Sequence, residues 1–123
     1  MRRSCYLLNL LSRGLFLLGF LALISGCQKR LPADQHIRVV MKKYAIDPQV
    51  IRVKAGERIE LSVIAADVQH GLDIPALGVK EPIQPGKTTI VYFTAPAKGE
   101  YKVVCGVICG PHHEDMVGKL VVE

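Results

Sequence analysis

The stretch "IELSVIA", residues 59–65, places apolar residues at every odd position, while Glu60, Ser62 and Ile64 occupy the even positions. Successive side chains of a β-strand point to opposite faces, so a period of two puts one kind of residue on each face. The odd positions then pack on a core and the even positions face away from it. The stretch therefore predicts a half-buried β-strand.

Short segments of similar character lie on both sides of this strand. They are residues 37–41, 50–53, 89–93, 101–105 and 119–122. Turn sequences rich in Gly and Pro separate them, including "KAGE", "QPGK" and "APAKG". Short strands with turns about every 8–12 residues are typical of a β-sandwich or barrel. No helical stripe appears after the N-terminal segment, so we predict an all-β sandwich.

The first 26 residues differ from the rest of the chain. A basic start, "MRR", precedes the almost wholly apolar run 15–24. Ten residues are short for a bilayer span, which needs about 20. A longer helix over residues 6–24 would have to bury Arg13, at a cost of about 2.5–3.5 kcal/mol. We therefore predict a signal peptide over residues 1–26 rather than a retained membrane helix.

The apolar run ends in "LISGC", which resembles the bacterial lipobox. This resemblance implies that Cys27 is lipidated, becomes the mature N-terminus and holds the protein to a membrane through acyl chains. An ordinary cleavage site followed by a free cysteine is the alternative. Residues 27–36 are polar, contain a proline and are predicted to form a tether, which leaves residues 37–123 as the folded domain. The expected location is the bacterial cell envelope, with the domain facing the periplasm or the exterior.

The charge balance argues against nucleic-acid binding. Removing Arg2, Arg3 and Arg13 with the signal peptide leaves 13 basic and 11 acidic residues, a net charge of +2. The only basic pairs that remain are residues 29–30 and 42–43, and aromatic residues are few. A nucleic-acid-binding protein usually carries a basic patch or stripe.

The segment "CGVICGPHHEDM", residues 105–116, gathers two cysteines, two histidines and a methionine between two predicted strands. It is expected to form a loop at one end of the sandwich. A disulfide between Cys105 and Cys109 is the default in an exported protein. It would close a very short ring with little entropic gain, and it would leave His113 and Met116 without a role.

Zinc and a reactive thiol are the next alternatives. A Cys2His2 zinc site could combine the two cysteines with a loop histidine and His70, but it would have no use for Met116. A nucleophilic thiol would need a base held by a third group. His112 or His113 could be that base, yet nothing in the sequence indicates an oxyanion hole.

Copper uses every one of these residue types. Thiolate, imidazole and thioether form the soft ligand set of copper electron-transfer sites. Two cysteines can bridge two copper ions, each with one histidine and one weaker ligand. Of the histidines outside the loop, His36 falls in the tether, whereas His70 follows the strand 59–65 in "DVQHG" and is expected at a strand end.

The loop fits the pattern C-x3-C-x3-H-x2-M and resembles the ligand loop of the binuclear copper A centre. "DVQHG" resembles the segment that carries the first histidine ligand of that family. Residues 37–123 are thus similar to the cupredoxin domain of cytochrome c oxidase subunit II, which nitrous oxide reductase shares. The resemblance implies a cupredoxin-like Greek-key sandwich, two copper ions and the ligands His70, Cys105, Cys109, His113, Met116 and the carbonyl of Val107. His112 is one position out of the pattern and is taken as a neighbour of the site.

The same resemblance implies a function in electron transfer. The domain would pass single electrons from a cytochrome c-type donor to a terminal oxidase or reductase, with no catalytic centre of its own. Val107 stands where the family often has Glu, so we predict no magnesium site there. The chain also lacks the family's Trp, which favours a free-standing, lipid-anchored domain. Copper delivery to an oxidase, or a structural or zinc-binding lipoprotein, are the alternatives. Asp73 and Glu114 are expected only to be solvated.

Overall fold

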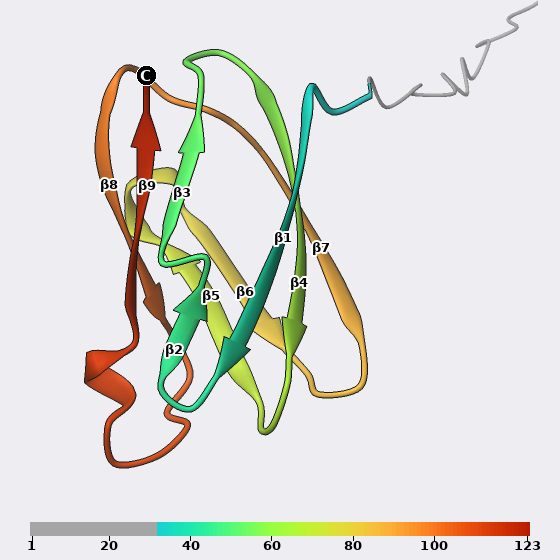
Figure 1. Cartoon of the computed structure of the whole chain (residues 1–123), viewed down its shortest axis with the longest axis vertical. Helices are drawn as coiled ribbons and strands as arrows, with labels where there is room; N and C mark the ends of the chain where they lie inside the picture. The colour runs from blue at the N-terminus through green and yellow to red at the C-terminus, as the bar shows by residue number, and fades with distance from the viewer. Residues whose placement is uncertain (1–31) are drawn as a thin grey trace, which may run out of the picture.

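The computed structural model describes residues 32–123, and these form strands with two short 3-10 turns (Figure 1). The strands are β1 (Gln35–Lys42), β2 (Ala45–Asp47), β3 (Val50–Val53), β4 (Arg58–Ala65), β5 (His70–Ile74), β6 (Val79–Ile83), β7 (Thr88–Thr94), β8 (Gly99–Cys105) and β9 (Val117–Val122). The turns are η1 (Pro75–Leu77) and η2 (His113–Asp115). The predicted signal peptide and Cys27 lie outside the described residues. Within residues 32–123, no helix is long and apolar enough to cross a membrane.

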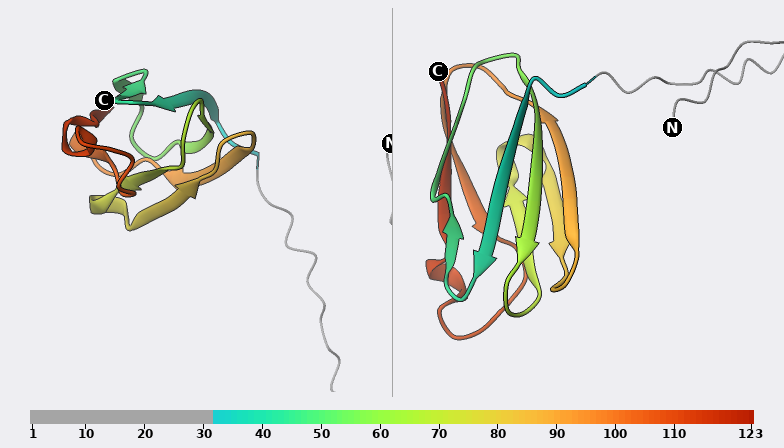
Figure 2. Two further views of the ribbon diagram at one scale, coloured as in Figure 1. Left: turned by 90° about the horizontal axis from the view of Figure 1, so that it is seen from below. Right: turned by 45° about the vertical axis from the view of Figure 1, so that its right-hand side comes forward.

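The strands form two sheets that face each other. One has the order β2-β1-β4-β7, and the other has the order β3-β9-β8-β5-β6. The views in Figure 2 show the two layers enclosing a common interior. Parallel pairs, β1 with β4 and β3 with β9, join otherwise antiparallel ladders. The predicted all-β sandwich is confirmed.

Strand β4 supplies the centre of the core, as its alternating sequence predicts. Ile59, Leu61 and Val63 are fully buried, and Ala65 is 3% exposed. They meet buried side chains from the opposite sheet, including Leu120 of β9. Burying an aliphatic side chain of this size contributes about 1.5–3 kcal/mol, so these positions are a main source of stability.

Three strands were missed by the sequence analysis. These are β2, β5 and β6. Strand β2 has three residues, β5 contains Gly71, and β6 contains Pro82, so none gives a clear period-two signal. Pro82 is tolerated because β6 is an edge strand, where a missing N–H group need not break a ladder. His70 lies at a strand end, as expected, and that end is the start of the separate strand β5.

The first strand also begins earlier than expected. Strand β1 starts at Gln35, two residues inside the segment assigned to the tether. His36 consequently belongs to the sheet, where its Nδ1 lies 3.2 Å from Oε1 of Glu60 on β4. The side chain of His36 is exposed. It lies on the outer face of the sheet because His36 is paired with Glu60, which also faces away from the core.

The segment 105–116 is a loop at one end of the sandwich, as predicted. It connects β8 to β9, whose register ends with Val104 opposite Val117. The N–H of Cys105 then donates to the carbonyl of Met116 at 3.2 Å, which closes the base of the loop. In Figure 1 the loop lies at the lower end of the molecule, the end where β1 and β4 finish.

Candidate metal centre

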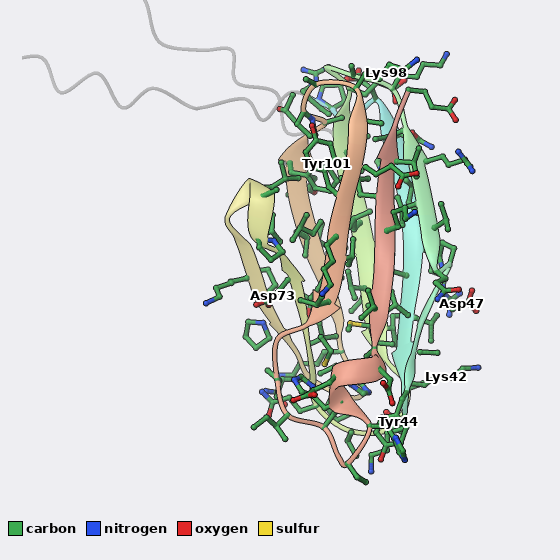
Figure 3. The ribbon with its side chains drawn as sticks, turned by 90° about the vertical axis from the view of Figure 1, so that its left-hand side faces the viewer. Lys42, Tyr44, Asp47, Asp73, Lys98 and Tyr101 are labelled. Carbon is green, nitrogen blue, oxygen red and sulfur yellow. The ribbon has the colours of Figure 1, made fainter. Side chains whose placement is uncertain are left out.

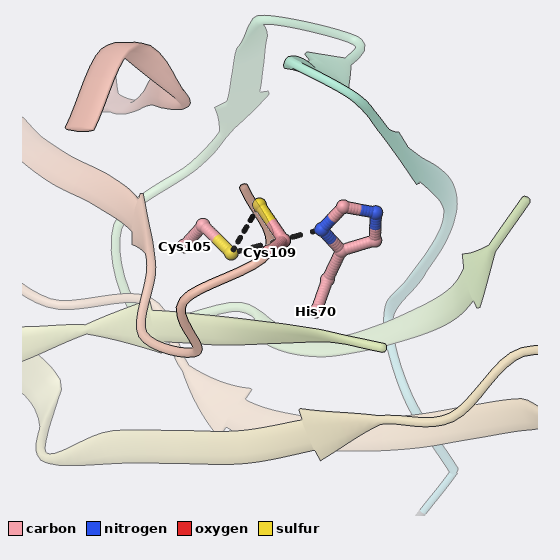
Figure 4. Close-up of side chains that lie close together, drawn as sticks. All are labelled: His70, Cys105 and Cys109. Carbon is pink, nitrogen blue, oxygen red and sulfur yellow. Dashed lines mark hydrogen bonds between the residues drawn. The ribbon is translucent and has the colours of Figure 1, made fainter. Parts of the chain in front are cut away.

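Three buried side chains meet at the base of this loop. His70, Cys105 and Cys109 each offer one donor atom, and these atoms all lie within 4.8 Å of one another. The Sγ atoms of the two cysteines are 4.0 Å apart, and Nδ1 of His70 is 3.8 Å from Sγ of Cys105 (Figure 4). Both cysteines are free thiols. The fold therefore joins the first residue of β5 to two residues that are distant from it in sequence.

Each thiol has two further neighbours with lone pairs. Cys105 has the imidazole of His70 and the carbonyl of Val107, whose oxygen is 3.2 Å from its Sγ. Around the Sγ of Cys109, Nδ1 of His113 lies at 4.0 Å and Sδ of Met116 at 3.4 Å. All six residues expected from the sequence are thus brought together. Their donor atoms are two thiol sulfurs, two imidazole nitrogens, one thioether sulfur and one carbonyl oxygen, a set that suits copper and exceeds what a tetrahedral zinc site uses.

The shape of the loop follows from its backbone hydrogen bonds. The N–H of His113 donates to the carbonyl of Gly110 at 3.1 Å, and the N–H of Met116 donates to the carbonyl of His113 at 3.2 Å. Gly110 has a φ of 150°, which disfavours other residues, and an added Cβ would lie 2.5 Å from Oη of Tyr44, so a larger residue would have to displace that side chain. These turns point Met116 inward, where it is 1% exposed.

The structure separates the two adjacent histidines. His113 lies beside Cys109, whereas His112 turns outward and its Nδ1 lies 3.1 Å from Oδ2 of Asp115. The His112 ring also contacts Tyr44, with ring centroids 5.3 Å apart. Tyr44 lies at the end of the sandwich that carries the loop (Figure 3). His112 is therefore a neighbour of the thiol cluster and not a member of it.

A carboxylate fixes the orientation of His70. Oδ1 of Asp67 is 2.7 Å from Nε2 of His70, the nitrogen that points away from the thiols. This contact places the ring proton on Nε2 and leaves the Nδ1 lone pair directed at Cys105. The backbone N–H of Lys43 donates to Oδ2 of Asp67 at 2.7 Å and, together with His70, lowers the pKa of that carboxyl to about 2. Asp67 was not among the residues expected at the site, although its position three residues before His70 in "DVQH" was a signal.

The sequence of this chain also matches a known protein family. Residues 14–122 match the family model of the cupredoxin-like domain.

The chain belongs to the cupredoxin-like domain family.

This cupredoxin domain is similar to two curated relatives and to one solved structure. Cytochrome c oxidase subunit 2 of Thermus thermophilus is 28% identical over 92 residues, which cover 75% of this chain and 68% of that protein. Cytochrome c oxidase subunit 2 of Zea mays is 31% identical over 93 residues, which cover 76% of this chain but 35% of that protein. The periplasmic domain of subunit II of cytochrome oxidase of Bradyrhizobium japonicum matches with a TM-score of 0.69 at 23% identity, covering 76% of this chain and 86% of that one.

Burial disfavours the charged form of the Cys109 thiol in this cupredoxin domain. It raises the pKa of Cys109, and the neighbouring Cys105 raises it further. Two thiolates side by side in a buried site would repel each other. A cation held there would offset that repulsion and favour deprotonation, so metal binding would release protons.

Asp73 has a different environment from the solvated one expected. It is half-buried, and its carboxylate lies over Gly106 so closely that a Cβ at position 106 would overlap both carboxylate oxygens. The N–H of Gly106 donates to the carbonyl of Gly71 at 3.0 Å, which ties the start of the ligand loop to β5. Gly106 therefore allows the loop to lie directly against Asp73 on β5.

Proposed function

We propose that this cupredoxin domain binds two copper ions in a copper A-type centre and transfers single electrons. The observation that carries the proposal is the arrangement around the two thiols. Cys105 and Cys109 lie side by side, and each has one imidazole and one weaker donor next to it. His70, Cys105, Cys109, His113 and Met116 would be the side-chain ligands, with the carbonyl of Val107 as the sixth.

Two copper ions held by Cys105, Cys109 and their neighbouring donors would supply one-electron redox chemistry. The protein's contribution is to hold the donor atoms still. Cys105 ends β8 and His70 begins β5, and these strands pair directly, with Leu72 opposite Cys105. Asp67 keeps the His70 ring in one orientation, and the burial of Met116 excludes water from that side of the site. A stiff, largely buried ligand set changes little between redox states, which favours fast electron transfer.

The similarity to subunit 2 of cytochrome c oxidase supports a place in respiration. We infer that a cytochrome c-type protein donates the electron and that a terminal oxidase or reductase accepts it. The chain aligns with 35% of the Zea mays protein, and the role proposed for this domain is that of an electron relay. Its location would be the cell envelope, attached through lipidated Cys27 and the short segment before β1, with the folded domain exposed to the periplasm or the exterior.

Metal analysis and absorption spectroscopy on the purified chain test the copper proposal. Two copper ions per chain, and a thiolate-copper spectrum that one electron bleaches reversibly, are the expected results. Cys105→Ser and Cys109→Ser should each abolish that spectrum. One exchangeable Cu(I) without the spectrum would instead support copper delivery. Zinc as the bound metal, or a Cys105–Cys109 disulfide in the metal-loaded protein, would contradict both functions.

The lipid anchor has a separate test. The chain with Cys27→Ser should lose incorporation of radiolabelled fatty acid and leave the membrane fraction, because the acyl chains would no longer be attached. Cys5→Ser is the matched control, since Cys5 lies within the predicted signal peptide and should leave labelling unchanged. Fatty-acid labelling that persists in the Cys27→Ser chain would contradict the lipobox prediction.

A further inference from the structure

The two sheets have four edge strands, and three of them carry features that oppose pairing with another chain. Strand β2 has only three residues, and β3 has four and carries the exposed Arg52. Strand β6 contains a lysine, a glutamate and a proline in succession, residues 80–82. Short length, charge and proline are the usual protections of a sheet edge.

Strand β7 is the exception. Its sequence, "TTIVYFT", has seven residues and neither charge nor proline. Among the described strands it pairs only with β4, so its other edge is open (Figures 1 and 2). Ile90 is 42% exposed and Tyr92 is 53% exposed, and both project from the outer face of the sheet. The Tyr92 hydroxyl hydrogen-bonds Glu60 on β4, which leaves its ring at the surface.

We propose that β7 pairs antiparallel with β7 of a second copy of this chain, about a two-fold axis at Val91. In this register, Ile90 of each copy lies opposite Tyr92 of the other, and Thr88 lies opposite Thr94. Aromatic with β-branched, and threonine with threonine, are favourable cross-strand pairs. The same strand of both copies thus forms the whole contact, as in a closed two-fold dimer.

The pairing would join two four-stranded sheets into one continuous sheet. No residue of the ligand loop 105–116 belongs to this edge, so the inference does not depend on the metal. Seven residues on each side are fewer than the roughly 20–30 of a standard interface. We therefore expect a weak dimer, with a Kd of about 1 μM to 1 mM.

The test is sedimentation velocity of the full chain in detergent, from about 1 μM to about 1 mM to span the expected Kd. The native chain should show a dimer whose fraction rises with concentration. Ile90→Lys with Tyr92→Lys places like charges opposite each other twice and should weaken the dimer at least about tenfold. Ile90→Glu with Tyr92→Lys places opposite charges in the same positions and should restore association to within about threefold of native.

Val50→Lys is the matched control, because Val50 is equally exposed but lies on β3. It should leave association unchanged, and thermal unfolding should show that all variants are folded. A native chain that stays monomeric throughout would overturn the proposal. Equal association of the two double variants would overturn the antiparallel register, and loss of the dimer in the Val50→Lys chain would overturn the assignment to β7.

Discussion

Asp67 decides how the His70 ring faces the two thiols. The carboxylate receives hydrogen bonds from two backbone N–H groups, those of Lys43 and Val68, each at 2.7 Å. It is therefore held in place independently of His70. A histidine ligand whose second nitrogen is bonded in this way presents one lone pair in one direction.

Asp67→Asn tests this role. The neutral side chain can keep one contact to the backbone but no longer holds the Nε2 proton of His70 as firmly. Copper affinity should fall about 10- to 100-fold, while the metal-free domain stays folded. Competition titration with a Cu(I) chelator measures the affinity. Asp115→Asn, next to the exposed His112, is the control and should change affinity much less. Equal losses in both variants would contradict the specific role of Asp67.

The contact between β5 and the ligand loop depends on a glycine and an aspartate that are distant in sequence. Asp73 on β5 occupies the space into which a side chain at position 106 would project. Strand β8 pairs with β5 through only two residue pairs, so this contact lies where the ladder ends and the loop begins.

Gly106→Ala should therefore disturb the site through a steric clash with a side chain. The new methyl group displaces Asp73 or the loop, and we expect a loss of stability of about 1–3 kcal/mol with weaker copper binding. Adding Asp73→Ala removes the obstructing carboxylate and should recover most of both properties. Urea unfolding measures the stability of the single and double variants, and copper titration measures their copper affinity. If the second substitution rescues neither property, the clash is not the cause.

The starts of β1 and β4 are held together by another pair. The N–H of Asp34 donates to the carbonyl of Arg58 at 2.7 Å, and the Arg58 side chain donates to the Asp34 carboxylate at 3.0 Å. The Arg58 side chain, with help from its backbone N–H, holds the pKa of Asp34 below its ordinary 3.8. A carboxyl whose pKa is lower in the folded state stabilises the fold above its unfolded pKa, and that contribution disappears as the pH falls through the folded pKa.

Asp34→Asn should accordingly lower the free energy of unfolding at pH 7. The difference from the native chain should shrink as the pH falls below about 4, because the native carboxyl also becomes neutral. Urea unfolding at pH 7, 4 and 2 provides the comparison. Glu81→Gln, an exposed change on β6, is the control and should show a smaller difference at pH 7. A difference between native and Asp34→Asn that stays constant with pH would argue against the ion pair.

Metal binding should stabilise the whole sandwich, since its proposed ligands come from β5, from β8 and from the loop that leads to β9. A ligand that binds only the folded state adds free energy according to its concentration and affinity, about 4 kcal/mol at 1,000 times Kd. Copper should therefore raise the unfolding temperature, and a chelator should reverse the effect. Calorimetry with and without Cu(I) measures this. The Cys109→Ser chain should show little or no shift, and a shift as large as that of the native chain would place the copper elsewhere.

The sequence by itself determined the fold class, and it predicted the six residues that lie together around the two thiols. Period-two alternation does not depend on which strands become neighbours, so β4, β7 and β8 were predicted from local pattern alone. The ligand loop is also local, since C-x3-C-x3-H-x2-M lies in one segment. That spacing favoured His113 over His112. In the structure His113 lies beside Cys109, whereas His112 lies beside Asp115.

Only the tertiary structure decided which distant groups meet. His70 reaches Cys105 because β5 pairs with β8, and such pairing depends on contacts between residues far apart in the chain. The same holds for Asp67 beneath His70, for Asp73 over Gly106 and for the open edge of β7. Residue periodicity specifies the faces of a strand, but the identity of its neighbours follows from how the two sheets pack around one core.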